Sequence, residues 1–156
     1  MLDALLVVQA NLAGSYDALG RSEQAANLYR DVYSGRLKLN GMENEHTLIA
    51  ANNYASSLRN LKRFKEARSL LRKTIPVARR VLGDSHEITL RMRWVYAETF
   101  YKADAATLDD LREAVTTLED TDRIARRVLG SAHPLAKIIG NNLRLARAVL
   151  QAATEK

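Results

Sequence analysis

Apolar residues along this chain recur at intervals of three and four, the spacing that places side chains on one face of an α-helix. Two such stripes follow one another near the start of the chain, and the segment Gly20-Arg21-Ser22 separates them. The stripes consist of Leu5, Leu12, Tyr16 and Leu19, and then of Ala25, Leu28, Tyr29 and Val32. The pattern predicts a helical hairpin whose second helix is capped by Ser22.

The hairpin pattern recurs along the chain. Asn11-Leu12-Ala13 returns 42 residues later as Asn53-Tyr54-Ala55, and Ala97 lies a further 42 residues on. The six residues Ala78 to Gly83 return as Ala125 to Gly130 at a spacing of 47. An insertion of about five residues around Ala105 to Asp109 explains the longer spacing. Periods of this length are typical of stacked helical repeats.

The repeats divide the chain into one domain of three and a half helical hairpins. The predicted units span approximately residues 1–41, 42–83 and 84–130, and a terminal helix follows over residues 131–153. Gly41, Gly83 and Gly130 are expected to end the second helices, and Pro134 fits the first turn of the seventh helix. The fold class is therefore all-α, with seven antiparallel helices.

Several local features carry their own expectations. Asp84 with Glu87 forms a predicted capping arrangement before Ile88, and Thr107 is expected to cap the helix that follows it. Pro76 should kink or interrupt its helix near Thr74 or Ile75. His86 and His133 occupy equivalent turns, where a turn or capping role is favoured over metal binding because no third ligand lies nearby.

These residues together resemble the tetratricopeptide repeat family, and specifically its kinesin light chain type, over roughly residues 5–150. The resemblance is carried by the Asn-Leu-Ala pattern at Asn11 and Asn53, the Leu19-Gly20-Arg21 turn, Ala25 and Ala67, and the Leu-Gly stretches that end at His86 and His133. It implies an α-solenoid in a right-handed superhelix. Lys62 in place of the turn glycine, Val95 in place of Asn and Arg144 in place of Ala depart from the family pattern.

The resemblance also implies a binding surface, because the first helix of each hairpin lines the concave face in this family. Asn side chains offer a donor and an acceptor to a peptide backbone, and Arg and Lys bind carboxylates. The predicted ligand is a short, partly acidic peptide of a partner protein. The predicted peptide-binding residues are Asn11, Asn52, Asn53, Arg59, Asn60, Arg91, Trp94, Tyr101 and Lys102.

Structural roles compete with this interpretation at two kinds of residue. Trp94 could be packed between helices rather than exposed in the groove, although Arg91, Trp94 and Tyr101 share one helical face. Asn11 and Asn53 could instead satisfy backbone groups of neighbouring helices. Both alternatives stay open at the level of the sequence.

Composition and charge refine the expected function. The net charge of +6 comes with strong polarity along the chain: residues 59–80 hold nine basic residues and one acidic residue, whereas residues 104–122 hold seven acidic residues and one basic residue. Basic side chains without interleaved aromatics, beside an acidic stretch, count against nucleic-acid binding. No apolar run is long enough to insert into a membrane. The absence of cysteine fits a reducing compartment, so a cytoplasmic location is expected.

The sequence therefore predicts an interaction module, or adaptor, that binds an acidic peptide. The alternatives are a scaffold that self-associates through its exposed repeat ends, near Met1 and Arg144, and a nucleic-acid binder that uses the basic surface. No phosphate loop, nucleophile motif or metal-ligand cluster is present in the sequence, so neither catalysis nor a metal nor another cofactor is expected.

Overall fold

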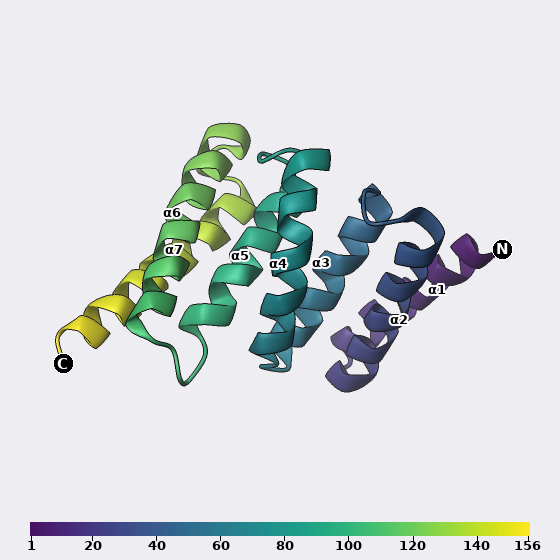
Figure 1. Ribbon diagram of the computed structural model, residues 1–156, viewed down its shortest axis with the longest axis horizontal. Coiled ribbons are helices and arrows are strands. Elements are labelled where there is room, and N and C mark those ends of the chain that lie inside the picture. The colour runs from purple at the N-terminus through teal and green to yellow at the C-terminus, as the bar shows by residue number, and fades with distance from the viewer. The chain divides into compact units, whose positions relative to one another are not determined.

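The computed structural model describes residues 1–156 and consists of seven α-helices and no strand (Figure 1). The helices are α1 (Leu2–Ala18), α2 (Ser22–Asn40), α3 (Glu45–Asn60), α4 (Phe64–Val81), α5 (Glu87–Tyr101), α6 (Leu108–Leu129) and α7 (Pro134–Thr154). The predicted all-α class is confirmed. The chain forms two compact units, Met1–Val81 and Leu82–Lys156.

In the unit Met1–Val81, each helix packs against the next one along the chain, from α1 to α4. The repeated alanines Ala13, Ala25, Ala55 and Ala67 are fully buried. A methyl side chain lets helix backbones approach closely, which explains why alanine recurs at these positions. Between α2 and α3, the rings of Tyr33 and Tyr54 lie with their centroids 6.3 Å apart.

The unit Leu82–Lys156 is a three-helix assembly in which α6 contacts both α5 and α7, and α7 also reaches α5. Its core includes Leu90, Phe100, Leu118 and Ile139, all of which are buried. The ring of Tyr96 packs edge-on against Phe100 at a centroid distance of 5.0 Å. The core is continuous across the three helices, so the terminal helix α7 is part of this unit.

The helix caps confirm some of the local predictions. The Nδ1 atoms of His86 and His133 accept hydrogen bonds from the backbone N–H groups of Ile88 and Leu135, each at 3.1 Å. Both histidines are therefore N-caps, as their repeated position indicated. Thr107 caps α6 in a reciprocal arrangement with Asp110.

Two local predictions were wrong, and one of the two alternatives given for Pro76, an interrupted helix, was also wrong. His86, rather than Asp84, caps α5, because its ring nitrogen reaches the first-turn amide. Ser22 is the first residue of α2 and Arg21 is the N-cap, without a side-chain hydrogen bond. Helix α4 continues through Pro76. One lost backbone hydrogen bond does not outweigh the burial of Leu71 and Ala78 on the two sides of the proline.

The turns between helices depend on left-handed backbone conformations. Gly41, Gly83 and Gly130 have positive φ angles at the ends of α2, α4 and α6, as predicted. Gly20 has φ of 76° in the turn after α1, and Lys62 adopts the same conformation, with φ of 61°, in the equivalent turn after α3. The turn thus keeps its geometry although the second repeat lacks the glycine.

Candidate functional site

The asparagine positions of the unit Met1–Val81 differ in exposure. Asn11 on α1 is exposed and Asn53 on α3 is half-buried. Asn52 is only 7% exposed, and its Oδ1 atom has no hydrogen-bond partner. Since a ligand could reach that buried oxygen only after the side chain moved, Asn53 is the better placed of the two α3 asparagines.

Arg59 and Asn60 lie at the C-terminal end of α3. The Nε atom of Arg59 donates a hydrogen bond to Oδ1 of Asn60 at 3.2 Å. Arg59 is half-buried and Asn60 is exposed. This end of α3 therefore presents a positively charged group to solvent beside an amide.

Helix α5 presents two cations, each held by a carboxylate on the same helix. Arg91 pairs with Glu87 at 2.8 Å, and Lys102, at the C-cap, pairs with the buried Glu98 at 2.5 Å. The Arg91 guanidinium lowers the pKa of the Glu87 carboxyl, chiefly through this hydrogen bond. Trp94 is half-buried on the same helix.

Tyr101 occupies a structural position. Its ring is 7% exposed, and its hydroxyl donates a hydrogen bond to Oδ1 of Asn142 on α7. Asn142 in turn donates from Nδ2 to the backbone carbonyl of Ile138 at 2.9 Å. Sequence reasoning missed Asn142, although it lies 47 residues after Val95 and so occupies the position of the repeated Asn11 and Asn53.

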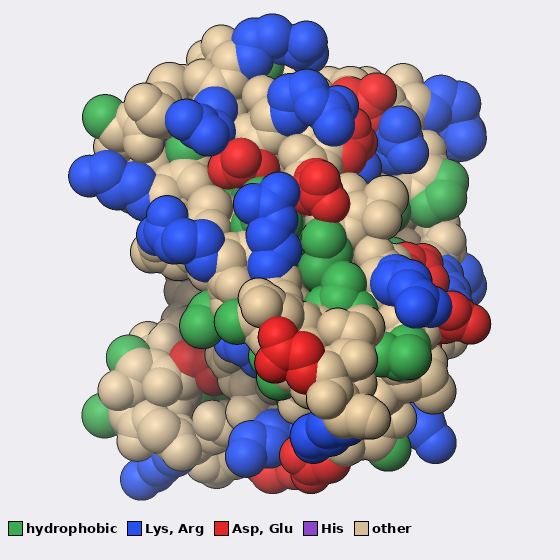
Figure 2. Space-filling view, turned by 90° about the vertical axis from the view of Figure 1, so that its left-hand side faces the viewer, with side chains coloured by type: hydrophobic (Ala, Val, Ile, Leu, Met, Phe, Trp, Pro, Cys, Tyr) green, Lys and Arg blue, Asp and Glu red, His purple; other side chains and the backbone are tan.

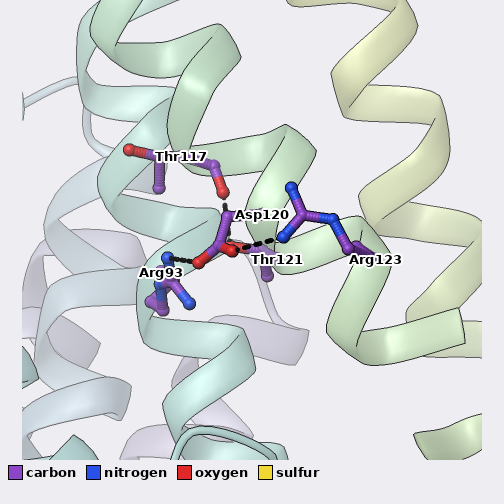
Figure 3. A network of polar contacts seen from close by, with 5 residues as sticks. All are labelled: Arg93, Thr117, Asp120, Thr121 and Arg123. Atoms are coloured by element: carbon purple, nitrogen blue, oxygen red, sulfur yellow. Dashed lines mark hydrogen bonds and ion pairs between the residues drawn. The ribbon is translucent and has the colours of Figure 1, made fainter. Parts of the chain in front are cut away.

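A second polar contact between helices was also missed. Arg93 on α5 is 7% exposed, and its Nη2 atom donates to Oδ2 of Asp120 on α6 at 2.5 Å (Figure 3). Arg123 approaches the other oxygen of Asp120 at 3.0 Å. No local pattern links residues that lie 27 positions apart, so only the packed helices show this pair.

The structure thus gathers the predicted site residues into two groups, one in each unit. Met1–Val81 holds Asn11, Asn52, Asn53, Arg59 and Asn60, and Leu82–Lys156 holds Arg91, Trp94, Tyr101 and Lys102. No group of His, Cys, Asp and Glu side chains could hold a metal ion. None of the helices has the length and apolar character that crossing a membrane requires.

Comparison with known proteins identifies the repeats. The family model for the tetratricopeptide repeat matches residues 46–121. A crystal structure of kinesin light chain nearly identical TPR-like repeats from Podosopora anserina has a TM-score of 0.81 at 24% identity, covering 96% of this chain and 69% of that chain. Residues 46–121 of this chain thus match the tetratricopeptide repeat (TPR) family, and the chain shares its fold with kinesin light chain TPR-like repeats.

Two further solved structures share the TPR fold. A single-substitution variant of the Podosopora anserina protein has a TM-score of 0.76 at 23% identity, covering 96% of this chain and 68% of that chain. BtubC (BKLC) from P. vanneervenii has a TM-score of 0.62 at 16% identity, covering 97% of this chain and 66% of that chain. No curated protein sequence matches the chain.

The TPR assignment confirms the resemblance and the solenoid class predicted from the sequence. TPR repeats generally mediate protein–protein interactions. The fold therefore indicates protein partners for this chain.

Proposed function

We propose that this TPR protein is an adaptor that binds a short, partly acidic peptide of a partner along the first helices of its hairpins. The main support is the α5 face, where Arg91, Trp94 and Lys102 combine two cations with a large aromatic ring. Arg and Trp are enriched among residues that dominate binding energy. An acidic ligand would compete with Glu87 for Arg91, since both partners of that ion pair are well exposed.

Helix α3, in the unit Met1–Val81, carries a separate set of proposed contact residues. Asn53 is half-buried and can offer both a donor and an acceptor to a peptide backbone. Arg59 adds a charge to the same helix and can form a charge-assisted hydrogen bond with a carboxylate. Tyr101 is left out of the proposed contacts because its hydroxyl is already bonded to Asn142.

The adaptor proposal is tested by fluorescence titration with a library of acidic, aromatic-containing peptides. Asn53→Ala and Arg91→Ala should each weaken saturable binding. Arg112→Ala is a matched control, since Arg112 forms a similar exposed pair with Asp109 on α6, outside the proposed surface. Unchanged affinity in both test variants would show that the assigned surface is wrong.

Self-association is a second candidate, favoured by one observation on α1. Leu5, Val8 and Leu12 are exposed on one face of this helix. The equivalent residues of α3, 42 positions later, are Thr47, Ala50 and Tyr54. Helix α2 contacts this face of α3, because Thr47 donates a hydrogen bond to the backbone carbonyl of Arg36 at 3.2 Å. The equivalent apolar face of α1 has no such covering helix in this chain.

Light scattering over a range of protein concentrations tests this second candidate. A mass that rises with concentration in the unmodified chain, and stays at the monomer value in Val8→Glu, would support self-association through α1. A constant monomer mass would contradict it. Nucleic-acid binding has no comparable support, and a cytoplasmic location stays a prediction.

A further inference from the structure

Helix α7 carries basic residues at three positions where the first helices of the hairpins carry apolar ones. In α5 these positions hold Leu90, Ala97 and Phe100, which are buried in the core that α5 shares with α6. The equivalent residues in α3 are Leu48, Ala55 and Leu58, and they are also buried. A spacing of 47 places Lys137, Arg144 and Arg147 of α7 at the same three positions.

These three side chains line an open cavity between α6 and α7. The cavity has a volume of about 440 Å³, and Arg126 and Asp122 of α6 complete its charged lining. Ala136, Gly140 and Leu143 of α7 also line it. Figure 2 views the molecule from the side where Figure 1 places α6 and α7, and it shows Lys and Arg side chains more widely spread than Asp and Glu.

The positive charge of the cavity is only partly compensated. Arg126 lies 3.7 Å from Asp122, and Arg147 lies 3.5 Å from Glu119, so both ion pairs are longer than a good charge-assisted hydrogen bond. Arg144 donates to the neutral amide oxygen of Asn141. Lys137 forms no ion pair. The lining of the cavity therefore contains four cationic side chains and a single carboxylate, that of Asp122. The cations are Arg126, Lys137, Arg144 and Arg147.

We propose that this cavity, which we name the α6–α7 cationic groove, binds an acidic segment of a partner protein. The groove lies on residues other than those of the proposed adaptor surface, so it is a second site. Lys137 and Arg147 are ten residues apart on α7, which corresponds to roughly 15 Å along the helix axis. An extended peptide of about five residues spans that length. Arg144 and Arg147 can each bind a carboxylate in a bidentate manner.

The lining of the groove favours a peptide over a nucleic acid. No Phe, Tyr or Trp side chain lines the cavity, so bases would find no surface on which to stack. Asp122 and the neighbouring Glu119 would repel a continuous phosphate backbone, whereas separate carboxylates of a peptide can be placed between them. The same charges exclude an apolar helix like those that cover α3 and α5, because it would bury unpaired cations.

The test is a fluorescence anisotropy titration of the full chain with labelled hexaglutamate near physiological ionic strength. The double variant Lys137→Gln/Arg144→Gln should raise Kd by about tenfold or more, a loss of about 1.4 kcal/mol. Both residues are exposed, so the variant should fold, which circular dichroism checks. The control Lys65→Gln/Arg112→Gln removes two exposed cations elsewhere and should leave Kd nearly unchanged.

The variants separate this inference from the adaptor proposal. Arg91→Ala should leave hexaglutamate binding at the groove intact. Weakening by Arg91→Ala but not by the double variant would overturn the groove and leave the adaptor proposal standing. An equal loss of hexaglutamate affinity in the control variant would also overturn the groove. So would displacement of the labelled peptide by short single-stranded DNA at a lower concentration than unlabelled hexaglutamate requires. A dimer of the unmodified chain that dissociates in the double variant would identify a second copy, not a partner protein, as the occupant.

Discussion

Arg93 of α5 and Asp120 of α6 form an ion pair that joins two consecutive helices, with the guanidinium buried and the carboxylate partly open to solvent (Figure 3). The Nη1 atom of Arg93 is buried without a hydrogen-bond partner. Asp120 is therefore the carboxylate that compensates a buried charge.

Removing the carboxylate should destabilise the chain. Asp120→Ala leaves the Arg93 charge buried and unpaired, which we expect to lower the free energy of unfolding by about 2 kcal/mol. The value lies below that for a fully buried pair because 37% of the Asp120 side chain is exposed. Arg93→Met in the Asp120→Ala background should recover most of the loss. Urea denaturation followed by circular dichroism measures both effects, and equal stability of Asp120→Ala and the unmodified chain would contradict the prediction.

The same pair should contribute to acid sensitivity. The hydrogen bond from Arg93 is the largest cause that lowers the pKa of Asp120 below its ordinary value. A lowered folded-state pKa stabilises the fold above the unfolded-state pKa, which is about 3.9, and that contribution is lost as the pH falls through the folded-state pKa. Asp120→Asn should therefore lose less stability than the unmodified chain between neutral pH and pH values below about 4.

The acid series has a control in Asp104→Asn, because Asp104 is exposed and forms no ion pair. This variant should follow the unmodified chain over the whole pH range. If Asp120→Asn and Asp104→Asn showed the same acid dependence, the Arg93 contact would not be its source.

Replacing Lys62 with glycine should stabilise the folded chain. Its φ of 61° is unfavourable for a residue with a Cβ atom, and relief of this strain by Lys62→Gly should raise the free energy of unfolding by about 1 kcal/mol. Lys62→Ala keeps the Cβ atom and should change stability little. Gly20 has the matching conformation, and no atom lies within 4 Å of a Cβ built there. Gly20→Ala should therefore destabilise through backbone strain alone, and thermal melting curves compare the three variants.

Tyr101 should act on stability and not on peptide affinity. Tyr101→Phe removes the donor to Asn142 and leaves a buried amide oxygen unpaired, at a cost of about 1 to 2 kcal/mol. Asn142→Leu in the Tyr101→Phe background removes the unpaired oxygen as well and should recover part of the loss. Chemical denaturation gives the stability, and peptide titration gives the affinity. Reduced affinity with unchanged stability would place Tyr101 in the binding surface instead.

Several site assignments made from the sequence depended on packing that no local pattern encodes. Asn11, Asn53 and Asn142 occupy equivalent repeat positions, yet Asn11 is exposed, Asn53 is half-buried and Asn142 is bonded to Tyr101. The repeat predicts that such an asparagine lies on a first helix. The burial and the hydrogen bonds of that asparagine depend on which side chains of a neighbouring helix pack against it.

The sequence by itself determined the number and order of the helices, the repeats of 42 and 47 residues, and the cap at Thr107. These features arise from the helical period and from hydrogen bonds between residues close in the chain. Only the tertiary structure decided that Arg93 pairs with Asp120 and that Lys137, Arg144 and Arg147 line a cavity with α6. Those arrangements join side chains from different helices, so they exist only once the helices have packed.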